Sequence, residues 1–220
     1  MRKIIKLFLG PIVQKIHAGY LKKPRRYSYK DISVWVEPGV FPPFLTLSTK
    51  ILLEFVEPMP LNGKQFLELG CGCGIISILA AKKGAEVTAA DINQTALDAL
   101  ARNSADNNVK LAIINSDLFQ NLNAQKFDCI VINPPYYPKA PQTAAEQAWF
   151  CGENFDYFEK LFAQLTSSLN DGNHTYMILS EDCEIETIQS IAAKNGIGFE
   201  TVLQKKVAAE RNFIFRLTFA

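Results

Sequence analysis

The sequence has little of what marks membrane proteins, metal sites and disulfide-rich proteins. No stretch approaches the roughly 18 consecutive apolar residues that a membrane-spanning helix needs. There are only two histidines, His17 and His174, and they stand far apart. The five cysteines are an odd number and include no C-x-x-C pair, so neither a zinc site nor a disulfide framework is predicted. We expect reduced thiols, a cytoplasmic location, no metal and no membrane association.

Acidic residues are missing from the first 30 positions, which hold nine of the 23 lysines and arginines. The remainder therefore carries 14 basic against 22 acidic residues. We interpret residues 1–45 as a basic amphipathic helix with an extended arm, and residues 46–220 as the main domain. A basic arm on an acidic body fits either a polyanionic or acidic partner, or a solvated extension with no partner.

Hydrophobic residues make up 48% of the chain, enough for the core of one domain. From about residue 65, short apolar stretches alternate with amphipathic ones. We expect strands at 65–70, 86–91, 109–115, 127–133 and 174–180 and in two C-terminal stretches, and helices near 75–83, 94–105, 156–169 and 184–194. This alternation predicts an α/β fold: a doubly wound, mostly parallel sheet with helices on both faces.

A glycine-rich turn follows the first of these strands. In FLELGCGCGII, Gly70, Gly72 and Gly74 lead straight into a helix. Glycines there allow a tight turn and a close approach of backbone to a ligand, and the helix start offers free N–H groups. Ile75 stands where G-x-G-x-x-G has its third glycine, which argues against a nicotinamide dinucleotide. The alternative is a turn with a purely structural role.

Two acidic residues end or follow the next strands. Asp91 lies 21 residues after Gly70, where a carboxylate can accept hydrogen bonds from both ribose hydroxyls. Asp117 can accept from an adenine amino group, with Leu118 or Phe119 against the ring. Each acid alone can be an ordinary turn residue. Together, at the carboxyl ends of successive strands, they predict a nucleoside site.

With Asn133-Pro134-Pro135-Tyr136 added to these motifs, the sequence resembles the class I S-adenosylmethionine (SAM)-dependent methyltransferases, from about residue 36 to the C-terminus. The resemblance implies a Rossmann-like fold whose seven-stranded sheet has its last strand antiparallel. It implies SAM as cofactor and S-adenosylhomocysteine as product. It also implies that SAM contacts Thr49, Glu68, Gly70, Cys71, Gly72, Gly74, Asp91, Ile92, Asp117, Leu118 and Asn133.

The tetrapeptide NPPY resembles that of methyltransferases acting on a nitrogen conjugated to a π-system, either an adenine amino group or a glutamine amide. Such a nitrogen is a poor nucleophile and carries two hydrogens. The side-chain oxygen of Asn133 and the backbone oxygen of Pro134 can accept one each, which aims the lone pair at the methyl group. Pro135 stiffens the loop, and Tyr136 can lie against the planar group. The alternative is a strand that merely ends at two prolines.

Two further segments resemble the HemK-like glutamine methyltransferases. VEPGVFPPFLTLSTKILLEF contains Thr49, and AAEQAWFCGENFDYFEKLF contains Trp149, Gly152 and Asn154 at the matching positions. Two positions depart from the family pattern: Cys151 and Phe155 each replace a glycine.

This second resemblance implies that the methyl acceptor is a glutamine of a protein such as a translation release factor. Some relatives also imply a small activating subunit. The alternatives are an adenine amino group of tRNA or rRNA, for which the basic arm would contact phosphates, and a non-catalytic SAM-binding protein.

Overall fold

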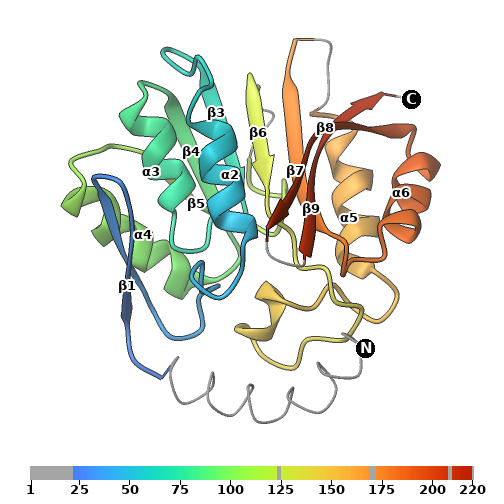
Figure 1. Cartoon of the computed structure of the whole chain (residues 1–220), viewed down its shortest axis with the longest axis horizontal. Helices are drawn as coiled ribbons and strands as arrows, with labels where there is room; N and C mark the ends of the chain where they lie inside the picture. The colour runs from blue at the N-terminus through green and yellow to red at the C-terminus, as the bar shows by residue number, and fades with distance from the viewer. Residues whose placement is uncertain (1–21, 123–124, 169–171, 208–209, 220) are drawn as a thin grey trace.

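The structure is a computed structural model that describes residues 22–122, 125–168, 172–207 and 210–219. Figure 1 shows its elements. The strands are β1 (Arg25–Tyr29), β2 (Ile32–Val36), β3 (Gln65–Leu69), β4 (Glu86–Asp91), β5 (Ala112–Asn115), β6 (Cys129–Ile132), β7 (His174–Ser180), β8 (Ile197–Val207) and β9 (Glu210–Phe219). The helices are α2 (Ser48–Val56), α3 (Ile75–Lys82), α4 (Gln94–Asp106), α5 (Asp156–Leu165) and α6 (Ile185–Lys194), with a 3-10 turn at Glu146–Ala148.

Strands β3 to β9 form one seven-stranded sheet in the order β5-β4-β3-β6-β7-β9-β8. Strands β5, β4, β3, β6 and β7 pair in parallel, whereas β9 pairs antiparallel with both β7 and β8. Leu69, the last residue of β3, lies opposite Ala90 of β4 and Ile132 of β6. This register brings the ends of three strands to one edge. It confirms the predicted Rossmann-like sheet with an antiparallel last strand.

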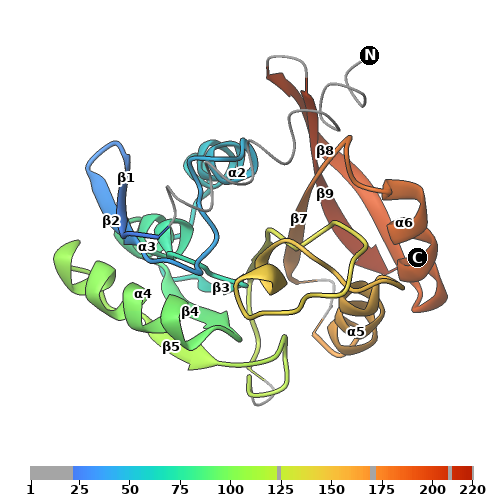
Figure 2. The ribbon, with the colours of Figure 1, turned by 90° about the horizontal axis from the view of Figure 1, so that it is seen from below.

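Each face of the sheet carries its own apolar core. Helices α2, α3 and α4 contribute to a cluster with one face of β3, β4 and β6, and α5 and α6 cover the other face. Figure 2 shows the helices on the two sides of the sheet. The centre of β3 and β6 is apolar without alternation because both faces are covered. None of the described helices is both long and apolar enough to cross a membrane.

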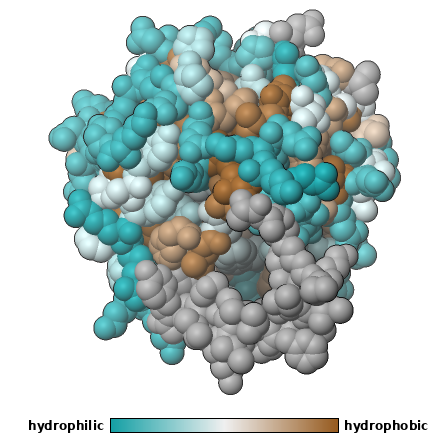
Figure 3. Space-filling view, in the orientation of Figure 1, coloured by the Kyte–Doolittle hydropathy of each residue, from teal (hydrophilic) through white to brown (hydrophobic). Residues whose placement is uncertain are grey.

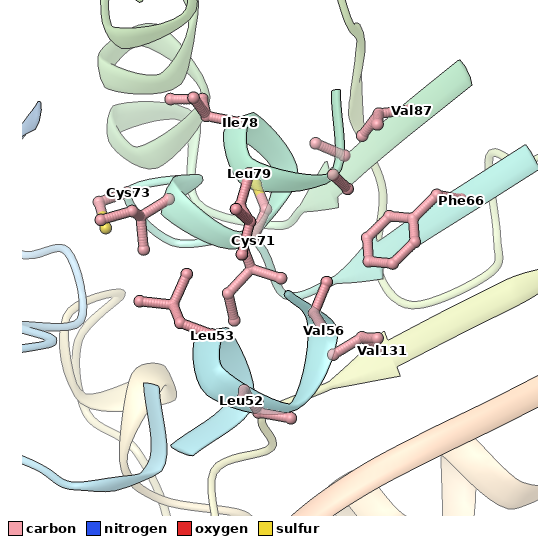
Figure 4. Close-up of a cluster of buried hydrophobic side chains, with 14 of the residues drawn as sticks. Leu52, Leu53, Val56, Phe66, Cys71, Cys73, Ile78, Leu79, Val87 and Val131 are labelled. Carbon is pink, nitrogen blue, oxygen red and sulfur yellow. The ribbon is translucent and has the colours of Figure 1, made fainter. Parts of the chain in front are cut away.

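Two cysteines of the glycine turn help to hold it in place. Figure 4 shows Cys71 and Cys73 among Leu52, Leu53 and the side chains of neighbouring elements. All five cysteines are buried and none is in a disulfide. Burial raises the pKa of Cys73 to about 12, so this thiol stays protonated and behaves as a small apolar side chain.

Residues 25–36 form an antiparallel hairpin, in which Arg25 pairs with Val36 and Tyr29 with Ile32. An extended arm was the prediction here, and it is wrong for this stretch: Ile32, Val34 and Val36 alternate along β2 and are buried in the main core. The predicted N-terminal basic helix falls on residues 1–21, outside the described residues. The division of the chain at residue 45 remains a prediction.

The hairpin is attached to α4 by two asparagine side chains. The amide of Asn103 accepts from the backbone N–H of Trp35 at 2.8 Å and donates to its carbonyl oxygen at 2.9 Å. Asn107, which caps the C-terminal end of α4 one turn later, makes the same two bonds with Ser33, at 3.2 and 2.8 Å. Residues four apart share one helix face, so this pair of amides bonds to β2 as a neighbouring strand would.

Candidate active site

A cavity of about 440 Å³ lies at the carboxyl ends of β3, β4 and β6. This is the edge where parallel α/β sheets bind ligands, and the volume is within the range of small-molecule sites. Most of the predicted site residues meet there, from five separate stretches of the chain. Those that line it are Thr49, Glu68, Gly70, Cys71, Gly72, Asp91, Ile92, Asp117, Leu118, Asn133 and Pro135.

The glycine turn forms one wall of the cavity. Gly70 and Gly72 have φ values of 78° and 52°, which favour glycine because a Cβ is strained in this region. A Cβ at Gly70 would meet no atom within 4 Å. The free space beside Gly70 therefore belongs to the cavity, where a ligand can approach the backbone.

Gly74 has a structural role that was not predicted from the sequence. It does not line the cavity; it is the residue before α3 and has a φ of 74°. A Cβ built there would lie 2.1 Å from the Cδ1 atom of Leu100 on α4. Gly74 must therefore be glycine so that α3 can pack closely against α4, and its contact with the cofactor stays a prediction.

Glu68 ties the end of β3 to the beginning of α3. Its carboxylate accepts from the backbone N–H of Ser77 at 2.8 Å and from the Ser77 hydroxyl. Burial raises the pKa of Glu68 to about 8, against the lowering effect of these two bonds, and the nearby Asp91 carboxylate raises it further. Glu68 is therefore a buried acid in the wall of the cavity whose charge state responds to a charged ligand.

Asp91 connects two loops at the same edge. One carboxylate oxygen accepts from Gly72 N–H at 2.8 Å and the other from Asn93 N–H at 2.9 Å. Burial raises the pKa of Asp91, and these backbone donors oppose the shift. Each oxygen keeps a lone pair for a further donor, so the carboxylate can hold the glycine turn and still accept from a ligand's hydroxyl groups.

The residues after β5 form the far wall. Asp117 lines the cavity and forms an ion pair with Lys160 of α5. Leu118 has a φ of 55°, and the Ser116 hydroxyl donates to its carbonyl oxygen at 2.7 Å. Ile92, which follows β4, also lines the cavity and is 46% exposed. Two apolar side chains and a carboxylate thus surround this part of the cavity.

Asn133 lies at the junction of the cavity and α2. Its amide nitrogen donates to the Ser48 hydroxyl at 3.3 Å. Its side-chain oxygen is buried and has no hydrogen-bond partner. A buried acceptor without a donor costs about 1–3 kcal/mol, so such groups usually have a ligand or a function. Thr49, beside Ser48, is buried in the same wall.

The rest of the NPPY stretch is divided between cavity and core. Pro135 lines the cavity, whereas Pro134 and Tyr136 do not. Tyr136 is 9% exposed and belongs to the core cluster on the α5–α6 side, with its ring centroid 4.9 Å from that of Tyr137. Tyr136 thus packs in the core on this side of the sheet, and its contact with the acceptor group stays a prediction.

That loop, residues 138–150, closes the cavity from the sheet's other half. Its two ends are joined by backbone bonds from Tyr137 N–H to Trp149 O at 3.1 Å and from Cys151 N–H to Tyr137 O at 2.9 Å. Lys139 places its ammonium 4.7 Å from the ring centroid of Phe150. The loop is therefore an ordered wall, whose small and aromatic side chains face the cavity.

Several cavity residues were not predicted from the sequence. Phe41, Phe150, Tyr157 and Lys160 line it; they lie within the two segments that resemble the HemK-like enzymes, but none was named as a site residue. The ring of Phe41 lies 4.9 Å from that of Trp149, which joins the two segments that resemble HemK-like enzymes. Their similarity to one family was the available signal that they meet in space.

The two departures from the family pattern lie together at the start of α5. Phe155 has a φ of 59°, a left-handed conformation in which the family's glycine is unstrained. Its side chain is buried against Phe158. Cys151 is buried in the cavity wall, and Gly152, with a φ of 89°, leaves no room for a Cβ beside Asp156. Asn154 is exposed and does not line the cavity.

The residues present fit SAM chemically. Carboxylates at Asp91 and Asp117 supply acceptors for hydroxyl and amino groups, and Gly70 leaves room for the ligand beside the backbone. Glu68 gives the wall an acid suited to a cationic ligand. In the part of the chain that the structure describes, no group of three or more His, Cys, Asp or Glu could hold a metal ion.

Comparison with known proteins identifies the family. The model of the family described as "Methyltransferase small domain" matches residues 31–188. A protein of Methanocaldococcus jannaschii that carries the name "Putative protein N5-glutamine methyltransferase" is 30% identical over 189 residues, which cover 86% of this chain and 83% of that protein.

Two other similarities involve RNA-modifying enzymes. Ribosomal RNA small subunit methyltransferase C of Hamiltonella defensa is 32% identical over 134 residues, or 60% of this chain and 39% of that protein. This chain therefore spans well under half of that enzyme. The structure of the T. thermophilus 16S rRNA N2 G1207 methyltransferase with AdoMet and guanosine has a TM-score of 0.63 at 22% identity, covering 88% of this chain and 50% of that one. This likeness confirms the fold.

Proposed function

This chain belongs to the methyltransferase small domain family and is a SAM-dependent methyltransferase, and we propose that it methylates the side-chain amide nitrogen of a protein glutamine. The acceptor would be a glutamine of a release factor or of another ribosome-associated protein. The residues proposed to hold SAM are those that line the cavity on the glycine-turn side, with Asp91 toward the ribose and Asp117 toward the adenine.

The unpaired side-chain oxygen of Asn133 carries this proposal. One N–H of its amide nitrogen donates to Ser48, which holds the side chain in place, and its buried side-chain oxygen is left as an acceptor without a donor. An NH2 group supplies the missing donor, and the Pro134 carbonyl oxygen is the proposed acceptor for its second hydrogen.

The chemistry follows from that arrangement. SAM supplies an electrophilic methyl group on a sulfonium. Holding both N–H groups favours pyramidal geometry at the nitrogen and aims its lone pair. Transfer would form the N–C bond as the C–S bond of SAM breaks, and the cationic nitrogen would then lose a proton to water. Because that nitrogen is acidic only after transfer, no strong base is needed beside Asn133.

A glutamine acceptor is favoured by the segment around Trp149. It resembles the corresponding segment of the glutamine methyltransferases, and in the structure Trp149 contacts Phe41, which lines the cavity. The relative that matches over most of both chains carries a glutamine methyltransferase name.

A nucleobase amino group is the second candidate. The observation in its favour is the 32% identity with a ribosomal RNA methyltransferase, together with the five basic residues in the described stretch 22–30. An exocyclic amino group is also a planar NH2, so the Asn133 argument applies to both acceptors.

The deciding experiment offers both acceptors to one enzyme. Purified protein is incubated with methyl-labelled SAM and either a purified release factor or total RNA, both from cells that lack the gene. We expect label in the release factor and N5-methylglutamine after hydrolysis. A release factor whose acceptor glutamine is changed to glutamate is the matched substrate control.

The enzyme control is Asn133→Ala, compared with Asn115→Ala at an exposed amide at the end of β5. Label found only in RNA would exclude the glutamine proposal in favour of the second candidate. If neither acceptor is labelled, the assay is repeated with lysate fractions, which tests whether a small activating subunit is required. No transfer to protein in any fraction would contradict the proposal.

A further inference from the structure

The outer face of the β1–β2 hairpin carries a solvent-exposed tryptophan beside an arginine. Trp35 is 46% exposed and lies directly opposite Arg26 in the strand pairing. The Arg26 Nε atom donates to the Ser33 hydroxyl at 2.6 Å, and Ser28 donates to the same oxygen at 3.1 Å. Side chains on one face of an antiparallel pair are neighbours, so this face presents a ring, a cation and two hydroxyls together.

Trp35 is held in place from behind. Both its backbone groups are bonded to Asn103, which is fully buried on α4. Its neighbours Val34 and Val36 are buried in the core. A ligand that stacks on this ring therefore does not have to order the hairpin first, which removes one of the usual costs of binding.

The charge of the hairpin is strongly positive. Residues 22–36 contain five basic residues and one acid, Asp31, and that acid forms an ion pair with Lys82. Within the described residues, no ion pair is found for Lys22, Lys23 or Arg26. Figure 3 shows hydrophilic surface on the side of the molecule where β1 lies. A cationic surface around an exposed indole is complementary to an anionic chain that carries aromatic rings.

The hairpin leads directly into the cavity wall. Val40 and Phe41, which follow β2, line the cavity. Asn93, the residue before α4, donates to the Gly39 carbonyl oxygen at 2.9 Å, and Arg102 pairs with Glu37 at 2.8 Å. Figure 2, seen from below, shows the hairpin beside α4 on the same side of the molecule as the loops around the site. A chain bound to the hairpin thus lies near the cavity without entering it.

From these observations we propose that the outer face of the hairpin is a docking site for single-stranded RNA. Trp35 stacks on one base, and Lys22, Lys23 and Arg26 contact phosphates of the flanking nucleotides. Stacking on an aromatic side chain combined with cationic contacts is how proteins bind single strands without reading sequence. The inference goes beyond the proposed function, because it concerns where the enzyme is held and not which nitrogen it methylates.

The test is binding of the full-length protein to a fluorescein-labelled 12-nucleotide oligouridylate, followed by anisotropy at 50 to 200 mM salt. We expect Trp35→Ala to weaken binding about 5- to 100-fold and Trp35→Phe to restore most of the loss. Replacing Lys22, Lys23 and Arg26 by glutamine should reduce the steepness of the log–log salt dependence by about 2, since each phosphate contact contributes about 0.7 for a single strand.

Val202→Ala and Lys206→Gln on β8 are the matched controls, because both side chains are exposed at the opposite edge of the sheet. Their binding should equal that of the unaltered protein. Wild-type-like binding by Trp35→Ala and by the triple variant would overturn the proposal, as would equal displacement by polyglutamate, which would point to an acidic protein instead. Thermal melting checks that every variant folds. Methylation of the release factor should be unchanged in all of them, so failure here is distinct from failure of the proposed function.

Discussion

The two sides of the cavity differ in how their polar groups are satisfied. On the glycine-turn side, Asp91 accepts from two loops and Glu68 accepts twice from Ser77. Every carboxylate there already has a partner within the fold. On the β6 side, the oxygen of Asn133 is buried with none.

This difference suits the two proposed tasks of the cavity, which are to bind SAM on one side and the methyl acceptor on the other. Internal bonds preorganise the cofactor side, so SAM meets a wall that is already shaped. In the proposed reaction, the acceptor side is completed when an NH2 group arrives and donates to the unpaired oxygen of Asn133. The lack of a donor for the Asn133 oxygen is therefore the observation that most directly supports a planar NH2 nitrogen as the proposed methyl acceptor.

The largest expected effects come from comparing one substitution on each side of the cavity. Asn133→Ala should lower kcat about 10²- to 10³-fold, the usual loss for one group that positions charge in a transition state, with SAM affinity changed less than twofold. Asp91→Ala should instead weaken SAM binding tenfold or more, because it removes an acceptor for the ligand and releases Gly72. Calorimetry for SAM and single-turnover rates at saturating SAM separate the two. Equal loss of affinity in both variants would break the comparison.

The next effect tests whether Gly74 belongs to the fold and not to the cofactor site. Gly74→Ala should destabilise the protein by about 2–4 kcal/mol, from left-handed strain and from the clash with Leu100. Gly70 has a similar φ of 78°, but a Cβ there would have no neighbour within 4 Å. Gly70→Ala should therefore lower the free energy of unfolding by the backbone strain alone, and it should weaken SAM binding. Urea unfolding together with SAM titration checks both. A less stable Gly70 variant than Gly74 variant would contradict this assignment.

Features that depend on local spacing could be predicted from the sequence, whereas features that depend on packing between distant segments could not. The glycine turn and Asp91 are short-range patterns tied to strand ends, and they could be located from spacing alone. Gly74 belongs to the same pattern, but its role depends on Leu100, which is 26 residues further on. Nothing in the local spacing distinguishes a glycine that faces a ligand from one that faces a helix.

The hairpin was missed although a signal was present. Alternation of buried and exposed residues in ISVWV predicts a strand, but the surrounding cations favoured the interpretation as an arm. The attachment through Asn103 and Asn107 depends on an asparagine pair four residues apart on α4, which looks unremarkable in sequence. The unpaired oxygen of Asn133 and the burial of Tyr136 depend on packing from several segments, and no pattern in the chain encodes them.

A smaller effect concerns pH and the buried Glu68. Its pKa in the fold is about 8, above its ordinary value of 4.5, so its contribution to stability is complete below pH 4.5 and is lost as pH rises through 8. A net cationic ligand lowers this pKa. SAM affinity should therefore rise with pH up to about 8, by at most tenfold per unit, and then level off.

Glu68→Gln is the control, because the amide keeps the shape but cannot ionise. Its SAM affinity and its unfolding free energy should both be flatter between pH 5 and 8. Calorimetry in buffers of different ionisation enthalpy should show proton release on SAM binding for the unaltered protein only. The same pH slope in both proteins would mean that another group is responsible.

The smallest effect concerns an exposed ion pair at the cavity. Lys160 pairs with Asp117, and both side chains are well exposed, at 42% and 38%. Solvent screening makes such a pair worth less than about 1 kcal/mol. Lys160→Met should therefore leave stability nearly unchanged. It should raise SAM affinity by about threefold at most in low salt, because it removes a cation near a cationic ligand and frees an Asp117 acceptor. At 0.5 M salt the difference should shrink, since the Debye length is then shorter than the separation of most surface charges.

Lys160→Arg, which keeps the charge, should bind SAM as the unaltered protein does. Lys194→Met removes a comparable exposed lysine, which pairs with Glu159 at 3.2 Å on α5 and α6, and should leave SAM binding unaltered. If Lys160→Met weakens SAM binding instead, Lys160 itself contacts the ligand. The far wall would then resemble the acceptor side, where a group needs the ligand to complete its bonds, more than it resembles the preorganised glycine turn.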